Sequence, residues 1–361
     1  MTFSKHQSDI ETDERQKNDA RPPERPNPHA PRKKPNHIYD MTDVPILPKV
    51  PLSPHERIEI CIPSRGRTAN LITLLQALRD QRFVRWDLTI LDDNPDDSLE
   101  TDPSLEKMVM LTEMAGHRTR IIKGASAGLI PAQNTLLAAT RKNLIARIDD
   151  DTLPDGIDYL EQLVDAMLND RTGRLGAVGG PIADVRSPSL DDHRLPPEEE
   201  LDKYYPFESP HIRYVQPKDA VPRTVPSLYS SFLYKRPVAW AAGGFSMSYS
   251  PIAEKEDTDL LVRMGMLGAT CLFLPRAQLW HLKAPMGGIR FLSERERAAL
   301  FQQDYLNFVS RVKQLRAETF DWAAESAANL SPFQRFTALD DSTRGYIDLS
   351  PPNKEDNHPG S

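Results

Sequence analysis

Residues 144–152, Leu-Ile-Ala-Arg-Ile-Asp-Asp-Asp-Thr, place three consecutive carboxylates directly after an apolar run. An apolar run with β-branched residues is typical of a buried strand in an α/β sheet. The carboxylates would then stand at the carboxyl end of that strand, where open α/β sheets bind their ligands. This stretch therefore predicts the class of the fold and the position of a polar site.

Three adjacent acids repel one another, so they need water, a basic neighbour or a cation. Asp149 and Asp151 point to the same side if the chain stays extended. That geometry suits Mg²⁺ or Mn²⁺, which take a few carboxylate oxygens and leave other positions for phosphates. The alternative is an acidic strand-to-helix turn whose last member caps a helix near Pro154 and Asp155. The stretch alone favours neither interpretation.

The first half of the chain alternates expected strands with expected helices. Strands are expected at 58–62, 88–91, 120–123, 144–148 and 175–178, and helices at 71–78, 103–115, 131–140 and 156–169. This alternation predicts an α/β fold with a mostly parallel central sheet flanked by helices. The strand at 88–91 also ends on acids, Asp92 and Asp93, at what should be the same edge of the sheet. Helix capping alone explains that repeated placement poorly.

The second half begins with residues 182–225, a Pro-rich and charged connection with little periodicity, and connections of this length are usually functional or mobile. A later helix carries Glu256, Asp257 and Asp259 in its first turn, where each acid favours the helix dipole by roughly 0.3–1 kcal/mol. The dipole explains one such acid better than three. His281 ends an apolar run and, taken alone, is more often a core or loop histidine than a metal ligand. Further strands are expected at 228–234 and 269–274, and an amphipathic helix at 293–317.

Composition limits the classes of protein to be considered. Hydrophobic residues make up 39% of the 361, and the net charge of −7 gives no global reason to expect a nucleic-acid partner. Cys61 and Cys271 both lie in apolar runs, so we expect reduced core thiols in a cytoplasmic protein. No apolar stretch approaches the roughly 20 residues that a membrane span needs. The Pro-rich, charged residues 1–55 predict a disordered arm, and the end of the chain from 321 to 361 a mostly flexible tail.

A set of short motifs occurs between residue 58 and His281. They are Pro63-Ser64-Arg65, Leu91-Asp92-Asp93-Asn94, the segment from Gly128 to Gln133-Asn134, Ile148-Asp149-Asp150-Asp151, Gly243-Gly244-Phe245 and Glu256-Asp257-x-Asp259-Leu260. In their types and order, these motifs resemble those of family 2 glycosyltransferases of the GT-A fold. His281 falls where many members of that family place a further metal ligand. Gln133 departs from the pattern, because arginine is common at its position in the family.

The resemblance implies that a sugar moves from a nucleotide-diphosphate sugar, with a UDP-sugar expected, to an acceptor hydroxyl with inversion. Mn²⁺ or Mg²⁺ would be held by Asp149, Asp151 and His281, and it would neutralise the leaving phosphates. Asp257 would be the general base, while Asp259 would serve the helix dipole or bind an arginine. The resemblance also implies nucleotide contacts for Pro63, Asp92, Asp93, Asn134 and Asp150, and acceptor contacts for Gly243 and Gly244. It leaves Glu256 to an acceptor contact or a structural bond.

Residues 56–181 would form the nucleotide-sugar-binding half, and residues 182–320 the acceptor-binding half with a closing helix. The acceptor stays open between a glycan, a peptide, a lipid-linked molecule and a small metabolite. The alternative function is that of a catalytically inactive sugar-nucleotide-binding or scaffold protein with the same fold. A nicotinamide-dependent oxidoreductase would need Gly-x-Gly-x-x-Gly after the first strand. A phosphate-loop enzyme would need Gly-Lys-Ser/Thr. Neither motif occurs in the sequence.

Overall fold

A large sheet forms the centre of the part of the chain that the computed structural model describes, which is residues 46–96, 99–185, 220–282, 287–339 and 342–347. Within these residues the sheet has nine strands, in the spatial order β12 (Gly345–Ile347), β3 (Thr119–Lys123), β2 (Trp86–Asp92), β1 (Ile58–Ser64), β4 (Leu144–Arg147), β9 (Phe232–Lys235), β6 (Leu175–Gly179), β10 (Thr270–Phe273) and β8 (Arg223–Val225). All the described residues belong to one compact unit, Asp43–Ser361.

The sheet is mostly parallel, as the strand–helix alternation predicts. The strands from β12 to β4 pair in parallel, and so do β6 and β10. β9 runs antiparallel between β4 and β6, and β8 pairs antiparallel with β10 at the edge. Because β1, β2 and β4 run in the same direction, their carboxyl ends meet at one edge of the sheet. This arrangement brings the loops after Ser64, Asp92 and Arg147 together.

A second, three-stranded sheet lies beyond that edge, with the order β5 (Thr152–Pro154), β11 (Leu279–His281), β7 (Ile182–Asp184). β11 pairs antiparallel with β5, so that His281 is the register partner of Thr152. A histidine that is remote in sequence is thereby placed beside the end of the triple-aspartate stretch.

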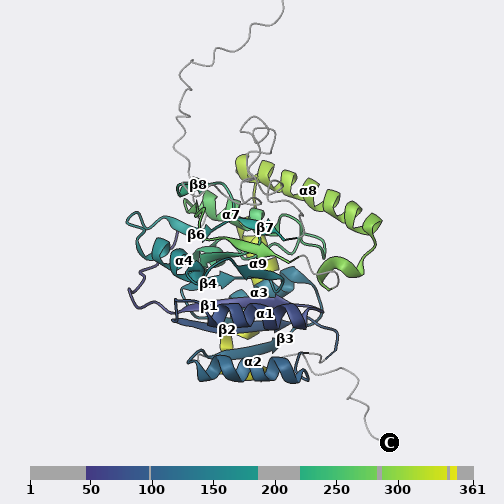
Figure 1. The fold of residues 1–361 in the computed structure, drawn as a ribbon. Helices are drawn as coiled ribbons and strands as arrows, with labels where there is room; N and C mark the ends of the chain where they lie inside the picture. Colours follow the sequence, from purple (N-terminus) through teal and green to yellow (C-terminus); the bar gives the residue numbers. More distant parts are fainter. Residues whose placement is uncertain (1–45, 97–98, 186–219, 283–286, 340–341, 348–361) are drawn as a thin grey trace, which may run out of the picture. The chain divides into compact units, whose positions relative to one another are not determined.

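Helices cover both faces of the large sheet (Figure 1). One face packs against α1 (Thr68–Arg79), α2 (Pro103–Met114) and α4 (Tyr159–Leu168). The other packs against α3 (Leu129–Ala139), α6 (Arg236–Ala241), α7 (Glu256–Met266), α8 (Glu294–Arg316), α9 (Trp322–Leu330) and the 3₁₀ helix η4 (Ser331–Ala338), and a second 3₁₀ helix, η3, spans Gly288–Phe291. In α1 the apolar residues at helical spacing are all buried, namely Leu71, Leu74, Leu75 and Leu78. Their burial anchors the helix that follows β1.

The expected elements are present, with one notable shift in the second half. β9 begins at Phe232, although the sequence pattern favours a strand from 228. Ser230 interrupts the strand because its φ of 41° is left-handed and its backbone N–H donates to Asp257 rather than to a neighbouring strand. A residue that looks like part of a strand therefore belongs to the functional site.

The expectation of a flexible tail from residue 321 is wrong for much of that segment. α9 and η4 bury apolar side chains against the same core as α3 and α7, including Trp322, Leu330, Phe333 and Phe336. β12 then extends the sheet by pairing in parallel with β3. The apolar residues in this segment lie among Pro and polar residues. The composition of the segment therefore does not predict that it packs against the core. Residues 348–361 lie outside the described residues.

The expected C-terminal boundary of the disordered arm, residue 55, is also wrong. Residues 46–55 are described, and Leu47, Val50 and Leu52 pack against the two cores. Residues 1–45 and 186–219 lie outside the described residues, so the predictions for the arm and for most of the 182–225 connection are untested there. Cys61 and Cys271 are buried and free, as expected.

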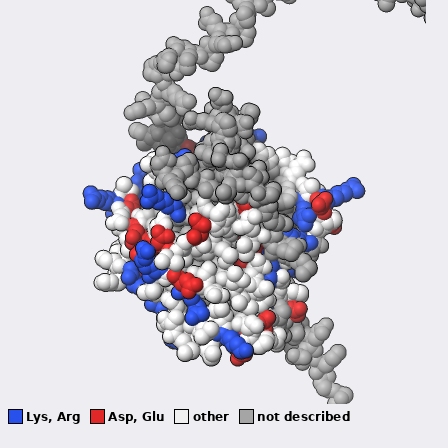
Figure 2. Space-filling view, in the orientation of Figure 1, with Lys and Arg blue, Asp and Glu red and all other residues white. Residues whose placement is uncertain are grey.

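Among the described residues, none of the helices is long and apolar enough to cross a membrane. On the face drawn in Figure 2, the described basic and acidic side chains are interspersed.

Candidate functional site

A cavity of about 470 Å³ opens where the carboxyl ends of β1 and β4 meet the start of α7. Eight of the residues proposed from sequence line it, and they are Pro63, Asp93, Asp149, Asp150, Asp151, Glu256, Asp257 and His281. The remaining four do not line it, and they are Asp92, Asn134, Gly243 and Gly244. A concave pocket with convergent polar groups is the usual form of a binding or active site.

The triple-aspartate stretch forms a turn at the end of β4. The backbone N–H of Thr152 donates to the Asp149 carbonyl oxygen at 3.1 Å, and the Thr152 hydroxyl donates to the same oxygen at 2.8 Å. The chain therefore does not stay extended here, so the condition under which Asp149 and Asp151 would point to one side is not met. Asp150 and Asp151 are buried in the turn, while the Asp149 side chain remains 24% exposed.

Arg67, in the loop before α1, supplies the positive charge that the turn needs. Its Nη1 lies 2.9 Å from Asp150 Oδ1 and 3.0 Å from Asp151 Oδ2. The Ser64 hydroxyl donates to the other Asp150 oxygen at 2.9 Å. Burial raises the pKa of the Asp150 carboxyl to about 6, although Arg67 and Ser64 pull it down. Both Asp150 oxygens are thus engaged, so this side chain joins the loops after β1 and β4.

Asp151 and His281 meet where the paired strands β5 and β11 of the second sheet begin and end, respectively. His281 Nε2 lies 3.4 Å from Asp151 Oδ2, and Arg290 Nη1 lies 4.0 Å from the same oxygen. Burial alone would raise the pKa of Asp151, but His281, Arg67 and Arg290 outweigh it and lower that pKa. The Oδ2 atom is buried and has no hydrogen bond of favourable geometry. The sequence prediction that these two residues meet is consistent with this placement.

Arg147 is a buried cation that the sequence analysis did not select. Its Nη2 donates to Glu256 Oε1 at 2.6 Å and lies 3.8 Å from Asp149 Oδ1. The guanidinium also lies 5.8 Å and 5.4 Å from the ring centroids of Phe232 and Phe245. Burial raises the pKa of Glu256 even though Arg147 lowers it. The available signal was an arginine inside an otherwise apolar strand, because such a residue needs a buried acid as its partner.

Asp257 is held at the amino end of α7 by backbone donors. The N–H of Ser230 donates to its Oδ2 at 2.7 Å, and the N–H of Thr258 donates to its Oδ1 at 2.5 Å. Left-handed backbone surrounds it, with φ values of 41° at Ser230, 56° at Ala253 and 71° at Lys255. Such conformations cost about 1–3 kcal/mol each and cluster at functional sites. The carboxylate is therefore placed by a strained and specific arrangement.

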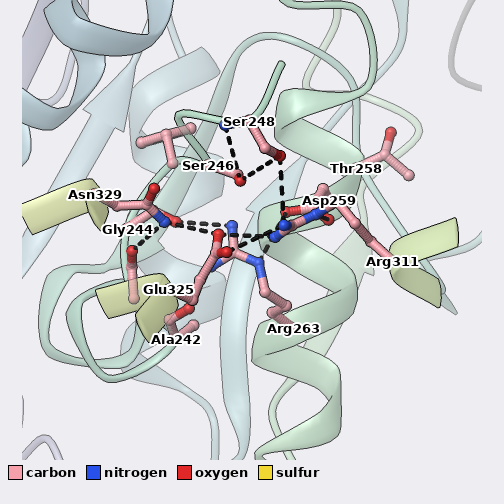
Figure 3. Close-up of polar contacts among 12 residues, drawn as sticks. Ala242, Gly244, Ser246, Ser248, Thr258, Asp259, Arg263, Arg311, Glu325 and Asn329 are labelled. Atoms are coloured by element: carbon pink, nitrogen blue, oxygen red, sulfur yellow. Dashed lines mark hydrogen bonds and ion pairs between the residues drawn. The ribbon is translucent and has the colours of Figure 1, made fainter. Parts of the chain in front are cut away.

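Asp259 does not line the cavity and belongs to a buried ion-pair network (Figure 3). Its oxygens accept from Arg263 Nε at 2.8 Å and from Arg311 Nε at 2.7 Å. Burial would raise the pKa of Asp259, but the two arginines outweigh it and lower that pKa. Of the two roles expected for Asp259, the helix dipole or an arginine partner, the structure shows the arginine partner.

The two acids after β2 have different surroundings. Asp93 lines the cavity, and its oxygens accept from the N–H groups of Ala127 and Gly128, both at 3.0 Å. Gly128 has a φ of 101°, which suits glycine and lets the loop turn over the carboxylate. Asp92 instead accepts from the backbone and side chain of Asn94 at 3.0 and 2.7 Å, outside the cavity lining.

Gly243, Gly244 and Asn134 lie away from the cavity, where α3 and α9 pack against the turn after α6. Asn134 exchanges two hydrogen bonds with the backbone of Phe245, both at 2.8 Å. A Cβ atom on Gly244 would lie 2.6 Å from Leu330 Cδ2 and 2.8 Å from Asn134 Oδ1. Close packing of α3, α9 and this turn therefore requires Gly244. The structure does not bring these residues to the cavity, where the resemblance implied nucleotide and acceptor contacts.

Comparison with known proteins finds one matching family and similar solved structures. Residues 59–229 match the sequence profile of glycosyl transferase family 2. The mannosyltransferase PcManGT from Pyrobaculum calidifontis, solved with GDP-Man and Mn²⁺, is similar with a TM-score of 0.51 and 14% identity, over 78% of this chain and 73% of that one. TarS from S. aureus, solved with UDP-GlcNAc, has a TM-score of 0.49 and 13% identity, over 78% of this chain and 72% of that one. No curated protein sequence matches the chain. The order of strands and the site at their carboxyl ends agree with the family match: the described chain has the GT-A fold, and its residues 59–229 match glycosyl transferase family 2.

Proposed function

We propose that the protein moves a sugar from a nucleotide-diphosphate sugar to an acceptor hydroxyl, with inversion at the anomeric carbon and with a divalent cation. The observation that carries the proposal is that the Asp151–His281 pair and the Asp257 carboxylate line one cavity from different elements. We call the part formed by Arg67, Asp150, Asp151 and His281 the donor end. The part formed by residues 250–258 is the acceptor end.

The donor end fits a cation that is shared with the substrate. No three His, Cys, Asp or Glu side chains in the described ranges lie close enough together to hold a metal by themselves. Mg²⁺ and similar ions are usually held by one or two carboxylates together with substrate phosphates. The buried Asp151 Oδ2, which lacks a well-formed hydrogen bond, and the adjacent His281 Nε2 supply such a partial set. The Mn²⁺ in the similar mannosyltransferase supports this assignment.

Mn²⁺ or Mg²⁺ would therefore be bound by Asp151 and His281 together with phosphate oxygens of the substrate, while Asp149, the third ligand that the resemblance implies, lines the same cavity without completing a three-residue set. When bound, the cation would neutralise charge on the leaving diphosphate. Arg67 and Arg290, which already lie beside Asp151, would add positive charge for the same phosphates. Asp150 holds Arg67 in that position.

The nucleoside would lie against the loops after β1 and β2. Pro63, Asp93 and the Ser126–Gly128 backbone line this side of the cavity. A carboxylate fixed by two backbone N–H groups is a rigid acceptor for base N–H groups, and a UDP-sugar is the donor that we propose first. Residues 56–181 would accordingly be the donor-binding half, and residues 182–320 would contribute the acceptor side.

Asp257 is proposed as the general base. An oxygen of its carboxylate would take the proton of the acceptor hydroxyl as that hydroxyl attacks the anomeric carbon and the nucleotide diphosphate leaves from the opposite face. A positioned base of this kind contributes typically 10²–10⁴-fold in rate. Glu256 is bound to Arg147, so its proposed role is to shape the acceptor end and not to accept this proton. The acceptor is proposed as a class, a hydroxyl compound that fits beside residues 250–258.

Donor hydrolysis tests the proposal. The full-length protein is incubated with UDP-glucose, UDP-GlcNAc and GDP-mannose, each with Mn²⁺ and with EDTA, and released nucleotide is measured. We expect metal-dependent release from one nucleotide sugar above the others. Binding of a nucleotide sugar without any release, with or without candidate acceptors, would favour the inactive binding protein instead.

A further inference from the structure

The wall of the acceptor end is a loop with an unfavourable backbone. Residues 250–255 lead into α7 and, with Pro251 as the first, five of these six residues line the cavity. Ala253 and Lys255 have φ values of 56° and 71°, which residues with a Cβ atom rarely adopt. Strained backbone persists only where surrounding contacts hold it. The contacts that hold this loop are therefore part of how Asp257 is placed.

Those contacts come from Asp304 on α8. The Asp304 side chain is fully buried, and its Oδ1 accepts from the Ser250 N–H at 2.7 Å. Its Oδ2 accepts from the Ser250 hydroxyl at 2.8 Å and from the Glu254 N–H at 3.0 Å. One carboxylate thus binds Ser250 and Glu254, which lie on either side of Ala253. Bonds from backbone N–H groups to a buried carboxylate are among the stronger hydrogen bonds in proteins.

A second residue of α8 holds the helix that the loop enters. Arg311 lies seven residues after Asp304, which is two turns along the same face of the helix. Its Nε and Nη2 donate to Asp259 at 2.7 and 3.2 Å, and its Nη2 and Nη1 donate to Glu325 of α9 at 2.7 and 3.0 Å. Figure 3 shows the side chains of Arg311 and Arg263 converging on Asp259. α7 is therefore tied to α8 and α9 through side chains that are almost completely buried.

We propose that Asp304 and Arg311 are positioning residues for sugar transfer: α8 holds residues 250–255 and α7 so that the Asp257 carboxylate faces the acceptor. The proposal rests on the proposed role of Asp257. Both residues lie outside the segment that matches the family profile, residues 59–229. On this proposal the base Asp257 is positioned by α8, which lies outside the segment that matches the family profile.

The first test compares Asp304→Asn with Gln303→Ala, an exposed neighbour on α8. The asparagine keeps one acceptor oxygen and loses the one that serves Glu254. We expect the Glu254 amide to exchange with solvent at least about tenfold faster, as measured by hydrogen exchange of the peptide that contains it. Donor-site affinity, measured with UDP and Mn²⁺, should stay within about twofold, while turnover of the donor falls roughly 10–100-fold, as small misplacements of a reacting group do. Gln303→Ala should match the wild type in all three measurements.

The second test asks whether backbone strain is the cause. Glycine adopts positive φ about as readily as negative φ. In the Asp304→Asn background, Ala253→Gly should recover a substantial part of the lost turnover, because the loop no longer resists its left-handed conformation. Arg311→Lys, which keeps the charge but cannot bridge Asp259 and Glu325 with a planar fork, should lower turnover and spare UDP binding in the same way. Ala253→Gly should not rescue Arg311→Lys.

Equal protection of the Glu254 amide in Asp304→Asn and wild type would overturn the inference. So would wild-type turnover in Asp304→Asn, or a parallel loss of UDP binding and turnover that Ala253→Gly leaves unrestored, since that pattern describes general destabilisation. Absence of turnover in the wild type with every nucleotide sugar would contradict the proposed function instead. Amide exchange needs no substrate, so the two failures are distinguishable.

Discussion

The donor end and the acceptor end of the cavity are built in different ways. At the donor end, Asp150 and Asp151 lie directly after β4, and their positive partner Arg67 follows β1, the neighbouring parallel strand. Regular sheet geometry therefore brings these groups together. At the acceptor end, Asp257 follows a strained loop and is supported by α8 and α9, which come from the last part of the described chain. The donor end depends on the sheet, whereas the acceptor end depends on long-range buried polar contacts.

The largest effect is expected from a change at the donor end. Asp151→Asn should abolish metal-dependent donor binding and reduce turnover by at least about 100-fold, because a neutral amide is a poor ligand for a hard cation. Calorimetric titration of UDP with Mn²⁺ and with EDTA measures the binding. The variant should bind UDP equally weakly in both conditions, and its melting temperature should stay near that of the wild type. Full activity of the wild type in excess EDTA would contradict the metal assignment.

The next effect concerns the C-terminal support of the acceptor end. Ending the chain after residue 320 removes the buried side chains of Trp322, Leu330, Phe333 and Phe336. At about 1.5–3 kcal/mol for each, their loss amounts to a large part of a typical total stability of about 5–15 kcal/mol. We expect this shortened protein to be unfolded or aggregated by circular dichroism and gel filtration. A chain that ends after residue 347 should fold as the full-length protein does. Native-like melting of the shorter chain would show that α9 is dispensable.

A smaller effect is expected from acid. Asp259 is buried and Glu325 is partly buried, and both have pKa values below their usual range because Arg263 and Arg311 outweigh the effect of burial. A carboxyl whose pKa is depressed by folding contributes stability above its unfolded pKa, and that contribution is lost as the pH falls through the folded value. The melting temperature should therefore decrease when the pH is lowered below about 4, which is near the pKa of these carboxyl groups in the unfolded chain.

Asp259→Asn isolates this contribution from that of other acids. The variant should be less stable than the wild type at neutral pH, and the difference between them should shrink as the pH falls below about 4. Asp165→Asn, on the exposed face of α4, should keep the wild-type pH dependence. A difference that stays constant across the whole pH range would mean that Asp259 stabilises the protein without its charge.

Much of the donor end could be predicted from sequence because its signals are local. An apolar strand that ends on acids predicts both the sheet and the position of Asp151, and parallel strands bring such ends together. The turn after Asp149 could not be foreseen, because it depends on Thr152 closing back onto the Asp149 carbonyl. Asn134 and Gly244, for which the motif order implied nucleotide and acceptor contacts, instead pack between α3 and α9 and do not line the cavity.

The α8 residues that support the acceptor end carry no local signal. Asp304 and Arg311 lie in an amphipathic, highly charged helix, where a sequence pattern gives no reason to separate them from their exposed neighbours. Arg147 gave a signal, since an arginine inside an apolar strand needs a buried partner, but not the identity of Glu256. The partners of Arg311, Asp304 and Arg147 lie 52, 54 and 109 residues away in sequence, respectively. Such pairings follow from the tertiary fold and become visible only in the structure.

The most direct test of the account is to separate donor binding from proton removal in Asp257→Asn. The variant is titrated with UDP and Mn²⁺, and single-turnover donor consumption is then followed with Asp165→Asn as the matched control. Because a general base acts mainly in the transition state, we predict UDP affinity within about twofold of the wild type and a rate lower by roughly 10²–10⁴-fold. A near-normal rate would contradict the assignment of Asp257 as the base and make Glu256 the next candidate. Equal losses of affinity and rate would contradict the separation of the two ends.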